Sequence, residues 1–435
     1  MLKGHRHLLC FHDPTVAELT VFLSPDLLES PLPILIKGFS MSSNSKDSSQ
    51  ESASYAALGA SSAKAGVLKA VGETDGARYF ASPLPDVAGD PESAFFLHAD
   101  GAGTKSIIAY LAFRESGSVL PFRYLAYDSM AMNLDDVACS GGVEGLFLSN
   151  TIGRNRAVIP DSAVAEIVTG YREYTEILAT EGISVQLGGG ETADMSDLVR
   201  TVVVDSTLCA RIPRSQLVDT WRVTPGDVIV GFSSTGKSRY ETQANSGIGS
   251  NGLTLARHVM LNSEYVIKYP EIVDPALSKD LAYRGSFKLS DTPAGLGMSV
   301  GEALLSPTRS YTPLIKVLLA TLGDKIHSLI HCTGGGQAKA KRFGRGVRYE
   351  KNNLFPTPPI FSLIQSHGNI PWEEMYAVFN MGHRLEACVD PASVPQVIAL
   401  GEQFGIAAQV VGRVTSSDTG NEVVISSPHG VFRYS

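Results

Sequence analysis

One arrangement recurs along this chain and limits the folds open to it: a short apolar run that leads straight into closely spaced glycines and polar side chains. The runs lie at residues 94–97, 183–187 and 326–331. Between the first two, the segment 160–179 repeats apolar residues with the period of a helix. Strands that alternate with helices in this way predict α/β (α+β) architecture, in both halves of the chain.

The first glycine turn contains the chemical groups that phosphate and Mg²⁺ require. It reads Asp100-Gly101-Ala102-Gly103-Thr104-Lys105. Glycines let backbone N–H groups approach anionic oxygens, Asp100 offers a hard oxygen ligand, and Lys105 carries a compact positive charge. Glycine turns after strands are common, so this motif alone indicates a nucleotide site only weakly.

A second block places acidic residues on an apolar helix. The stretch after residue 124 predicts a helix that is buried along one stripe and ended by a glycine pair. Asp128 and Asp135 share a face because they lie about two turns apart, and Asp136 adjoins them. Carboxylates in such surroundings are costly unless they are paired or bind a cation. They are therefore either magnesium ligands, or capping groups and salt-bridge partners.

The two later glycine segments repeat this logic. Gly189 and Gly190 are followed at once by Glu191 and Thr192, which again places a carboxylate beside an approachable backbone. In the third segment, Thr333-Gly334-Gly335-Gly336, the N–H groups are suited to a substrate phosphate, with Arg309 or Lys339 near enough to pair with it.

Residues 231–238 match the P-loop pattern GxxxxGK[ST] after an expected strand, 228–232. A P-loop must open a helix that packs on the sheet. Residues 239–249 are polar and broken by glycine, so a mobile polar loop is predicted instead. The next helix is expected only after Ser250-Asn251-Gly252.

Composition excludes several classes of protein. The chain has 435 residues, enough for two domains, and a formal net charge of −8 argues against nucleic-acid binding. No apolar run is long enough to span a membrane. The five cysteines lack CxxC spacing and are expected to be reduced thiols of a cytoplasmic protein.

Residues 1–53 are predicted to be a disordered extension, with Met41 as an alternative start. The following segment, 54–71, predicts a helix whose Lys64 and Lys69 either reach a nucleotide phosphate or form a solvated face. Composition shifts near residues 213–225, which predicts two domains, 54–216 and 217–435.

Taken together, the blocks resemble the aminoimidazole ribonucleotide (AIR) synthetases, the phosphoribosylformylglycinamidine cyclo-ligases of purine biosynthesis. The match covers residues 54–425 in the order of the family. The motifs that carry it are Asp100 to Lys105, Asp135-Asp136, Gly189 to Met195, Ser250-Asn251-Gly252, Ser306-Pro307-Thr308-Arg309-Ser310-Tyr311, Thr333 to Gly336, and residues 374–382.

The resemblance implies a two-domain fold shared with formylglycinamidine ribonucleotide synthetase, selenophosphate synthetase and thiamine-phosphate kinase. It implies a homodimer in which N-terminal strands form a shared barrel near an ATP and Mg²⁺ site, and a C-terminal domain with a mixed sheet. It also implies the reaction, in which ATP activates the formyl amide oxygen of formylglycinamidine ribonucleotide, the amidine nitrogen closes the ring, and phosphate leaves.

By the same resemblance, each motif residue takes a role. Asp136 and Lys105 are the expected catalytic residues. The expected magnesium ligands are Asp100, Asp136 and Glu191, with Asp128 and Asp135 as second candidates. Expected nucleotide contacts are Asp100, Gly101, Gly103, Thr104, Lys105, Lys64, Lys69, Gly189, Gly190, Thr192 and Asn251. Expected substrate contacts are Arg309, Thr333, Gly334, Gly335 and Gly336.

The chain departs from the family pattern at several positions. Asp135 replaces a common Asn, Gly249 replaces a common His, and residues 236–248 form an unusual insertion. His383, Arg384 and Glu386 stand where many members are glycine-rich and apolar, and either alter a substrate contact or form a local ion pair. The alternatives to a cyclo-ligase are another kinase or synthetase of the superfamily, a non-catalytic nucleotide-binding paralogue, and a P-loop NTPase.

Overall fold

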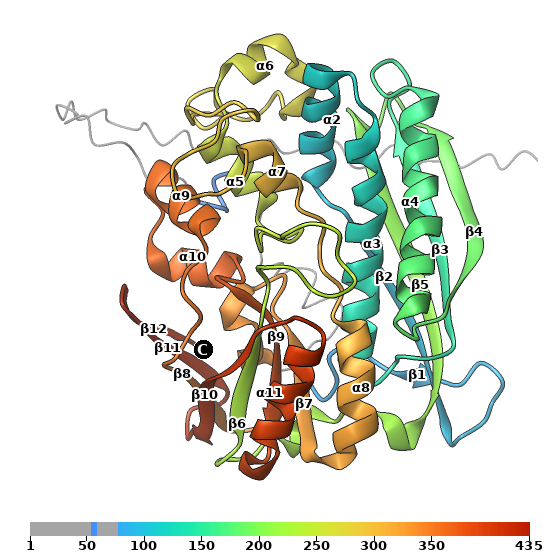
Figure 1. Cartoon of the computed structure of the whole chain (residues 1–435), viewed down its shortest axis with the longest axis vertical. Helices are drawn as coiled ribbons and strands as arrows, with labels where there is room; N and C mark the ends of the chain where they lie inside the picture. The colour runs from blue at the N-terminus through green and yellow to red at the C-terminus, as the bar shows by residue number, and fades with distance from the viewer. Residues whose placement is uncertain (1–53, 59–76) are drawn as a thin grey trace, which may run out of the picture. The chain divides into compact units, whose positions relative to one another are not determined.

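Two mixed β-sheets organise the chain (Figure 1). The computed structural model describes residues 54–58 and 77–435, which belong to one structural unit, Gln50–Ser435. The expected extension 1–53 and the expected contacts Lys64 and Lys69 lie outside the described residues. Within them, no helix combines the length and the apolar character that crossing a membrane needs.

The first sheet has the strand order β1-β2-β5-β3-β4. Its pairs are antiparallel except β3 with β4, which are parallel. The strands are β1 (Leu84–Pro85), β2 (Ser93–Gly101), β3 (Leu146–Arg154), β4 (Val185–Asp194) and β5 (Val202–Pro213). In the described residues of this half, the helices are α2 (Lys105–Ser116), α3 (Leu120–Ala138) and α4 (Asp161–Thr180).

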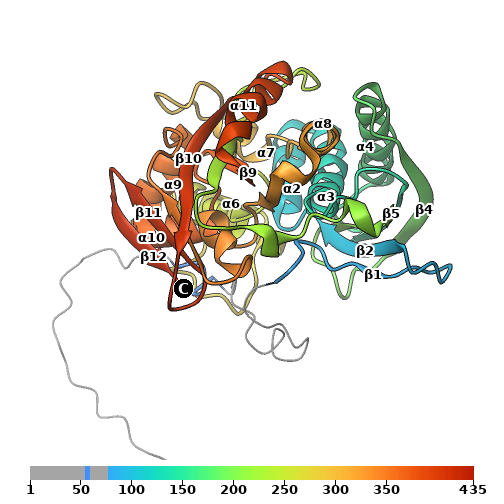
Figure 2. The same cartoon turned by 90° about the horizontal axis from the view of Figure 1, so that it is seen from below.

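One face of the first sheet is covered by helices and the other is open (Figure 2). Buried and exposed residues alternate along β5, as expected for a strand with one covered face. On the open face, the register places Cys209 between Leu97 and Phe147. The side chains of Leu97 and Phe147 are 58% and 56% exposed, so this face carries an apolar patch.

The second sheet has the order β12-β11-β8-β10-β6-β9-β7. Its strands are β6 (Val228–Ser233), β7 (Ile326–His331), β8 (Val347–Lys351), β9 (His383–Val389), β10 (Ala408–Ser416), β11 (Glu422–Ser427) and β12 (Gly430–Tyr434). Its helices are α5 (Leu253–Met260), α6 (Glu264–Lys268), α7 (Val300–Leu305), α8 (Thr312–Leu322), α9 (Pro359–Gly368), α10 (Trp372–Val378) and α11 (Val394–Gln403). Strand β9 is buried at every position.

One hydrophobic core cluster contains residues of both halves, from Ile108 on α2 to Tyr349 on β8. Helix α3 also packs against α8 (Figure 1). The two halves are therefore joined by a continuous core.

Several expectations from the sequence are confirmed. The helix expected at 160–179 is α4, and the acidic helix is α3. The P-loop pattern is confirmed as a decoy, since no helix follows residue 238 until α5 begins at Leu253. One expectation was wrong: Gly188, Gly189 and Gly190 do not form a turn. They continue β4, because pairing with β3 resumes after a register shift between Leu148 and Asn150.

Candidate functional site

Helix α3 uses Asp135 to cap α8 of the second half. The Oδ1 atom accepts hydrogen bonds from the backbone N–H groups of Tyr311 (2.8 Å) and Thr312 (3.0 Å). The hydroxyls of Ser310 and Thr312 also donate to it, at 2.6 and 3.0 Å. The Asp135 side chain is fully buried, so these bonds replace water for one of its oxygens.

Asp128 and Lys105 form a buried ion pair at the same junction. Lys105 Nζ donates to Asp128 Oδ1 at 2.7 Å and to the carbonyl of Ser306 at 2.5 Å. The backbone N–H and hydroxyl of Thr308 donate to the same Asp128 oxygen. Burial lowers the pKa of Lys105, and the charge of Asp128 opposes that effect. Thus the structure gives Asp128 and Asp135 the capping and pairing roles, and it holds Lys105 away from solvent.

Asp136 lies between two imidazoles. His331 Nδ1 is 2.7 Å from Asp136 Oδ1, and His98 Nε2 is 3.4 Å from Asp136 Oδ2. Because Arg384 Nε donates to His331 Nε2 (3.3 Å), the hydrogen-bond network assigns the ring proton of His331 to Nδ1. Burial alone would raise the pKa of Asp136, but the hydrogen bonds from both histidines hold it below the usual range.

Asp100 and His98 extend from the same face of β2, since residues two apart on a strand share a face. His98 Nδ1 is 2.9 Å from Asn133 Oδ1, and Asn133 Nδ2 donates to the Asp100 carbonyl. Burial opposes protonation of His98, yet its hydrogen bond with Asp136 raises its pKa overall. Burial and then the charge of Asp136 raise the pKa of Asp100, so the two carboxylates repel each other.

The third glycine turn lies beside these carboxylates. Lys339 Nζ is 3.8 Å from where a Cβ on Gly334 would be, and its charge interacts with Asp136 and Asp100. Burial lowers the pKa of Lys339. At Gly336 the φ angle is +52°, and a Cβ would lie 2.5 Å from the Phe379 carbonyl, so only glycine fits. We call Asp100, Asp136, Lys339 and the turn Thr333–Gly336 the carboxylate site.

Glu191 does not join this site within one chain. Asp100 pairs with Ser206 on β5, Ser206 with Asn150 on β3, and Asn150 with Gly190 on β4. The two edges of this row are three strand spacings apart, about 14 Å. Glu191, one residue further on, points to the open face, whereas Asp100 points to the helices. Gly189, Gly190 and Thr192 lie on this same exposed edge strand.

Arg309 does not face the glycine turn, contrary to expectation. Its guanidinium is fully buried and donates to Glu241 Oε2 and to the carbonyls of Ser233, Thr235 and Gly236. All of its donors are used to hold the loop that carries the P-loop-like sequence. No donor of Arg309 is left for a phosphate in this structure.

Thr104, which directly precedes α2, contacts the start of α5, and Asn251 lies just before α5 in the sequence. Thr104 Oγ1 is 3.0 Å from Thr254 Oγ1, which brings the first glycine turn against the first turn of that helix. Asn251 is half-buried in the loop before it. Thus two motifs separated by about 150 residues meet there.

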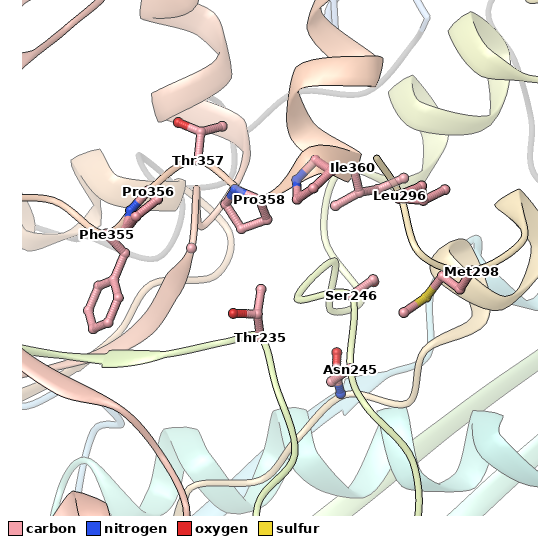
Figure 3. A pocket seen from close by; sticks show the side chains of 12 residues that line it. Thr235, Asn245, Ser246, Leu296, Met298, Phe355, Pro356, Thr357, Pro358 and Ile360 are labelled. Atoms are coloured by element: carbon pink, nitrogen blue, oxygen red, sulfur yellow. The ribbon is translucent and has the colours of Figure 1, made fainter. Parts of the chain in front are cut away.

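A cavity of about 330 Å³ is lined in part by Asn245 and Ser246, which belong to the loop before α5 (Figure 3). Its walls come from three segments, Asn245 and Ser246, Leu296 and Met298, and residues 355–360, and from the single residues Thr235 and Gly382. The lining is mainly apolar and proline-rich. The insertion 236–248 thus forms part of its wall.

Comparison with known proteins identifies the family. Models of the N-terminal and C-terminal domains of AIR synthase related proteins match residues 75–212 and 224–425. The chain belongs to the AIR synthase related protein family. A phosphoribosylformylglycinamidine cyclo-ligase of Methanocaldococcus jannaschii is 32% identical over 75% of this chain and 81% of its own length. One from Myxococcus xanthus is 31% identical over 72% and 79%.

A solved structure with a similar fold supports this architecture. Thermotoga maritima PurL, in a structure titled as its complex with FGAR, superposes with a TM-score of 0.50 at 14% identity, over 88% of this chain and 50% of that chain. The fold is the mixed α/β two-domain architecture of this family, with two mixed sheets.

Sequence reasoning on this family member missed two side chains of the site, His98 and His331. The alternation of side chains along a strand is a signal that could have found His98, because this residue lies two positions before Asp100 and so shares its face. His331 ends the strand before the third glycine turn, as Asp100 nearly ends β2. A search for polar residues at strand ends finds both of them.

Proposed function

We propose that this protein is a phosphoribosylformylglycinamidine cyclo-ligase, which uses ATP to close the imidazole ring of AIR. The observation that carries the proposal is the carboxylate site itself, where Asp100, Asp136 and Lys339 meet a glycine turn in a chain whose relatives bear this name. In this reaction the γ-phosphoryl group moves to the formyl amide oxygen, the amidine nitrogen attacks, and phosphate leaves.

Such a reaction needs positioned charges more than it needs a nucleophile on the protein. Asp136 is fixed by His331 and His98, so its carboxylate cannot rotate freely. Lys339 places a positive charge beside the turn, and no backbone N–H group of Gly334, Gly335 or Gly336 donates to another described residue. We assign the substrate's ribose phosphate to these N–H groups and to Lys339.

The residues present fit Mg²⁺ at one place. In enzymes, Mg²⁺ is bound through one or two carboxylates, with phosphate oxygens and water completing its shell. Asp100 and Asp136 suit this because a cation relieves their mutual repulsion, which adds to burial in raising the pKa of Asp100. When bound, Mg²⁺ would neutralise charge on the triphosphate. In the described part of the chain, no three His, Cys, Asp or Glu residues are grouped for an all-protein metal site.

We further propose a homodimer through the open face of the first sheet. The exposed Leu97 and Phe147 lie on one row of this face, and burying them against a second copy is favourable. The same association would bring Glu191, which points to this face, toward a neighbouring subunit. We also propose that the chain is divided into two domains, residues 54–216 and 217–435.

The test mixes the full chain with ATP, Mg²⁺ and formylglycinamidine ribonucleotide, and follows ADP and AIR. We expect both products, and we expect Asp136→Asn to form neither while it still folds and unfolds cooperatively. ADP without AIR from this substrate, or full turnover by Asp136→Asn, contradicts the proposal. Phosphorylation of a different small molecule would then indicate a kinase of the same superfamily.

A further inference from the structure

Arg384 is a buried cation without a carboxylate partner. It lies on β9 and is 1% exposed. Its Nε donates to His331 Nε2, and its Nη2 donates to the carbonyl of Arg309. Its Nη1 has no partner among the described residues. A guanidinium held away from water without an anion is costly, so this arrangement calls for a negatively charged ligand.

The unpartnered atom points at a glycine loop. At Gly249 the φ angle is +70°, and a Cβ there would lie 3.2 Å from Arg384 Nη1 and 3.9 Å from its Cζ. The guanidinium therefore lies against the backbone at Gly249. Two departures from the family pattern, a missing side chain at 249 and an added one at 384, meet at this contact.

The loop itself has unused donors. None of the backbone N–H groups from Gly249 to Gly252 donates a hydrogen bond to a residue in the described ranges. Gly249 and Gly252 are buried, and Ser250 and Asn251 are half-buried. The loop opens α5, whose eight residues add the positive end of a helix dipole.

Two cations and two carboxylates lie near the loop, and Arg384 is the one of them without an ion-pair partner among the described residues. Arg384 is close enough to Lys105 to lower the pKa of that lysine, so two cations approach one another here. Asp128 is occupied by Lys105 and Thr308, although its Oδ1 is also 3.3 Å from Ser250 Oγ. Asp135 Oδ2 is 3.7 Å from His331 Nε2 and is not paired with Arg384.

We propose that Arg384 and the loop Gly249–Gly252 bind phosphoryl oxygens, with Nη1 supplying charge and the loop supplying N–H donors. Assigning the anion to a reactant rests on the proposed function, whereas anion binding itself does not. Both the triphosphate of a nucleotide and the monophosphate of a ribose have this chemistry.

The test is calorimetric titration of the full chain with tripolyphosphate and, separately, with ribose 5-phosphate. We expect at least one probe to bind, and Arg384→Gln to weaken it about tenfold or more, as for loss of a hydrogen bond to a charged group. The probe affected distinguishes a nucleotide from a sugar phosphate. Arg413→Gln is the matched control, because Arg413 is 66% exposed and pairs with Glu350.

A second variant keeps the charge. Gly249→Ala puts a methyl group against Nη1 in a backbone conformation that favours glycine, so it should weaken the same probe. Thermal unfolding of each variant reports whether it folds. The proposal is overturned if the wild type binds neither probe, or if Arg384→Gln or, should that variant not fold, Gly249→Ala binds both probes as the wild type does. Probe binding without AIR formation would instead overturn only the proposed function.

Discussion

Replacing Asp135 tests whether this carboxylate caps α8 or binds a cation. In Asp135→Ala, the backbone N–H groups of Tyr311 and Thr312 lose their acceptor and cannot rotate to find another. Each lost bond to a charged group is worth about 1.5–3 kcal/mol, whereas the two hydroxyls can turn elsewhere. The two lost bonds should therefore lower the unfolding free energy of the variant by about 3–6 kcal/mol.

Asp135→Asn is the matched control, because an amide oxygen can stay where Oδ1 accepts its four hydrogen bonds. We expect it to cost about 1 kcal/mol. Urea unfolding followed by circular dichroism measures both variants. If Asp135→Asn were as damaging as Asp135→Ala, or if Asp135→Ala were as stable as the wild type, the capping assignment would be refuted. A matching loss of Mg²⁺-dependent nucleotide binding in Asp135→Asn would favour a cation ligand.

Three more outcomes follow from buried charges and the open face. Lys105→Met should cost about 3–5 kcal/mol in urea unfolding because Asp128 stays buried without its partner, and Asp128→Asn in that background should recover part of the loss. Burial alone would raise the pKa of Glu386, but Lys351 and then His383 lower it to about 2 from 4.5. The stabilisation that ionised Glu386 provides is therefore present above pH 4.5 and is lost as the pH falls from 4.5 to 2. In Glu386→Gln the unfolding temperature should depend less steeply on pH between 4.5 and 2, and a dependence as steep as that of the wild type would contradict this. Phe147→Glu should convert a dimer to a monomer in light scattering, and a monomeric wild type would disprove the interface.

Local patterns predicted the elements well because helix and strand periodicity depend on neighbours in sequence. Helix α4 and the absence of a helix after residue 238 were both read from the spacing of apolar residues. Glycine was the weak point. The run at Gly188–Gly190 has turn composition, yet β3 supplies pairing partners that keep it in β4. The residues of the run itself do not show that β3 will pair with them.

The roles of the acidic residues on α3 were beyond local reasoning for a different reason. Asp128 accepts from Thr308 across 180 positions of sequence, and Asp135 accepts from Thr312 across 177. Spacing on a helix showed that the two carboxylates share a face, but only the three-dimensional structure shows which donors occupy it. The same holds for Asp136, whose partner His331 lies 195 positions away.

These long separations have a consequence for the order in which the protein is made. A ribosome finishes α3 long before it delivers the segment from Ser306 to His331, so in the nascent first half Asp135 lacks its four donors, and Asp128 and Asp136 keep only Lys105 and His98 as partners. Carboxylates that keep their hydration resist burial, and the helix cannot close against its final neighbours. The first half must wait, with part of its apolar surface uncovered, until most of the chain has emerged. For this protein, completion of the fold is therefore a late event in synthesis, and the waiting half is a natural client for chaperones.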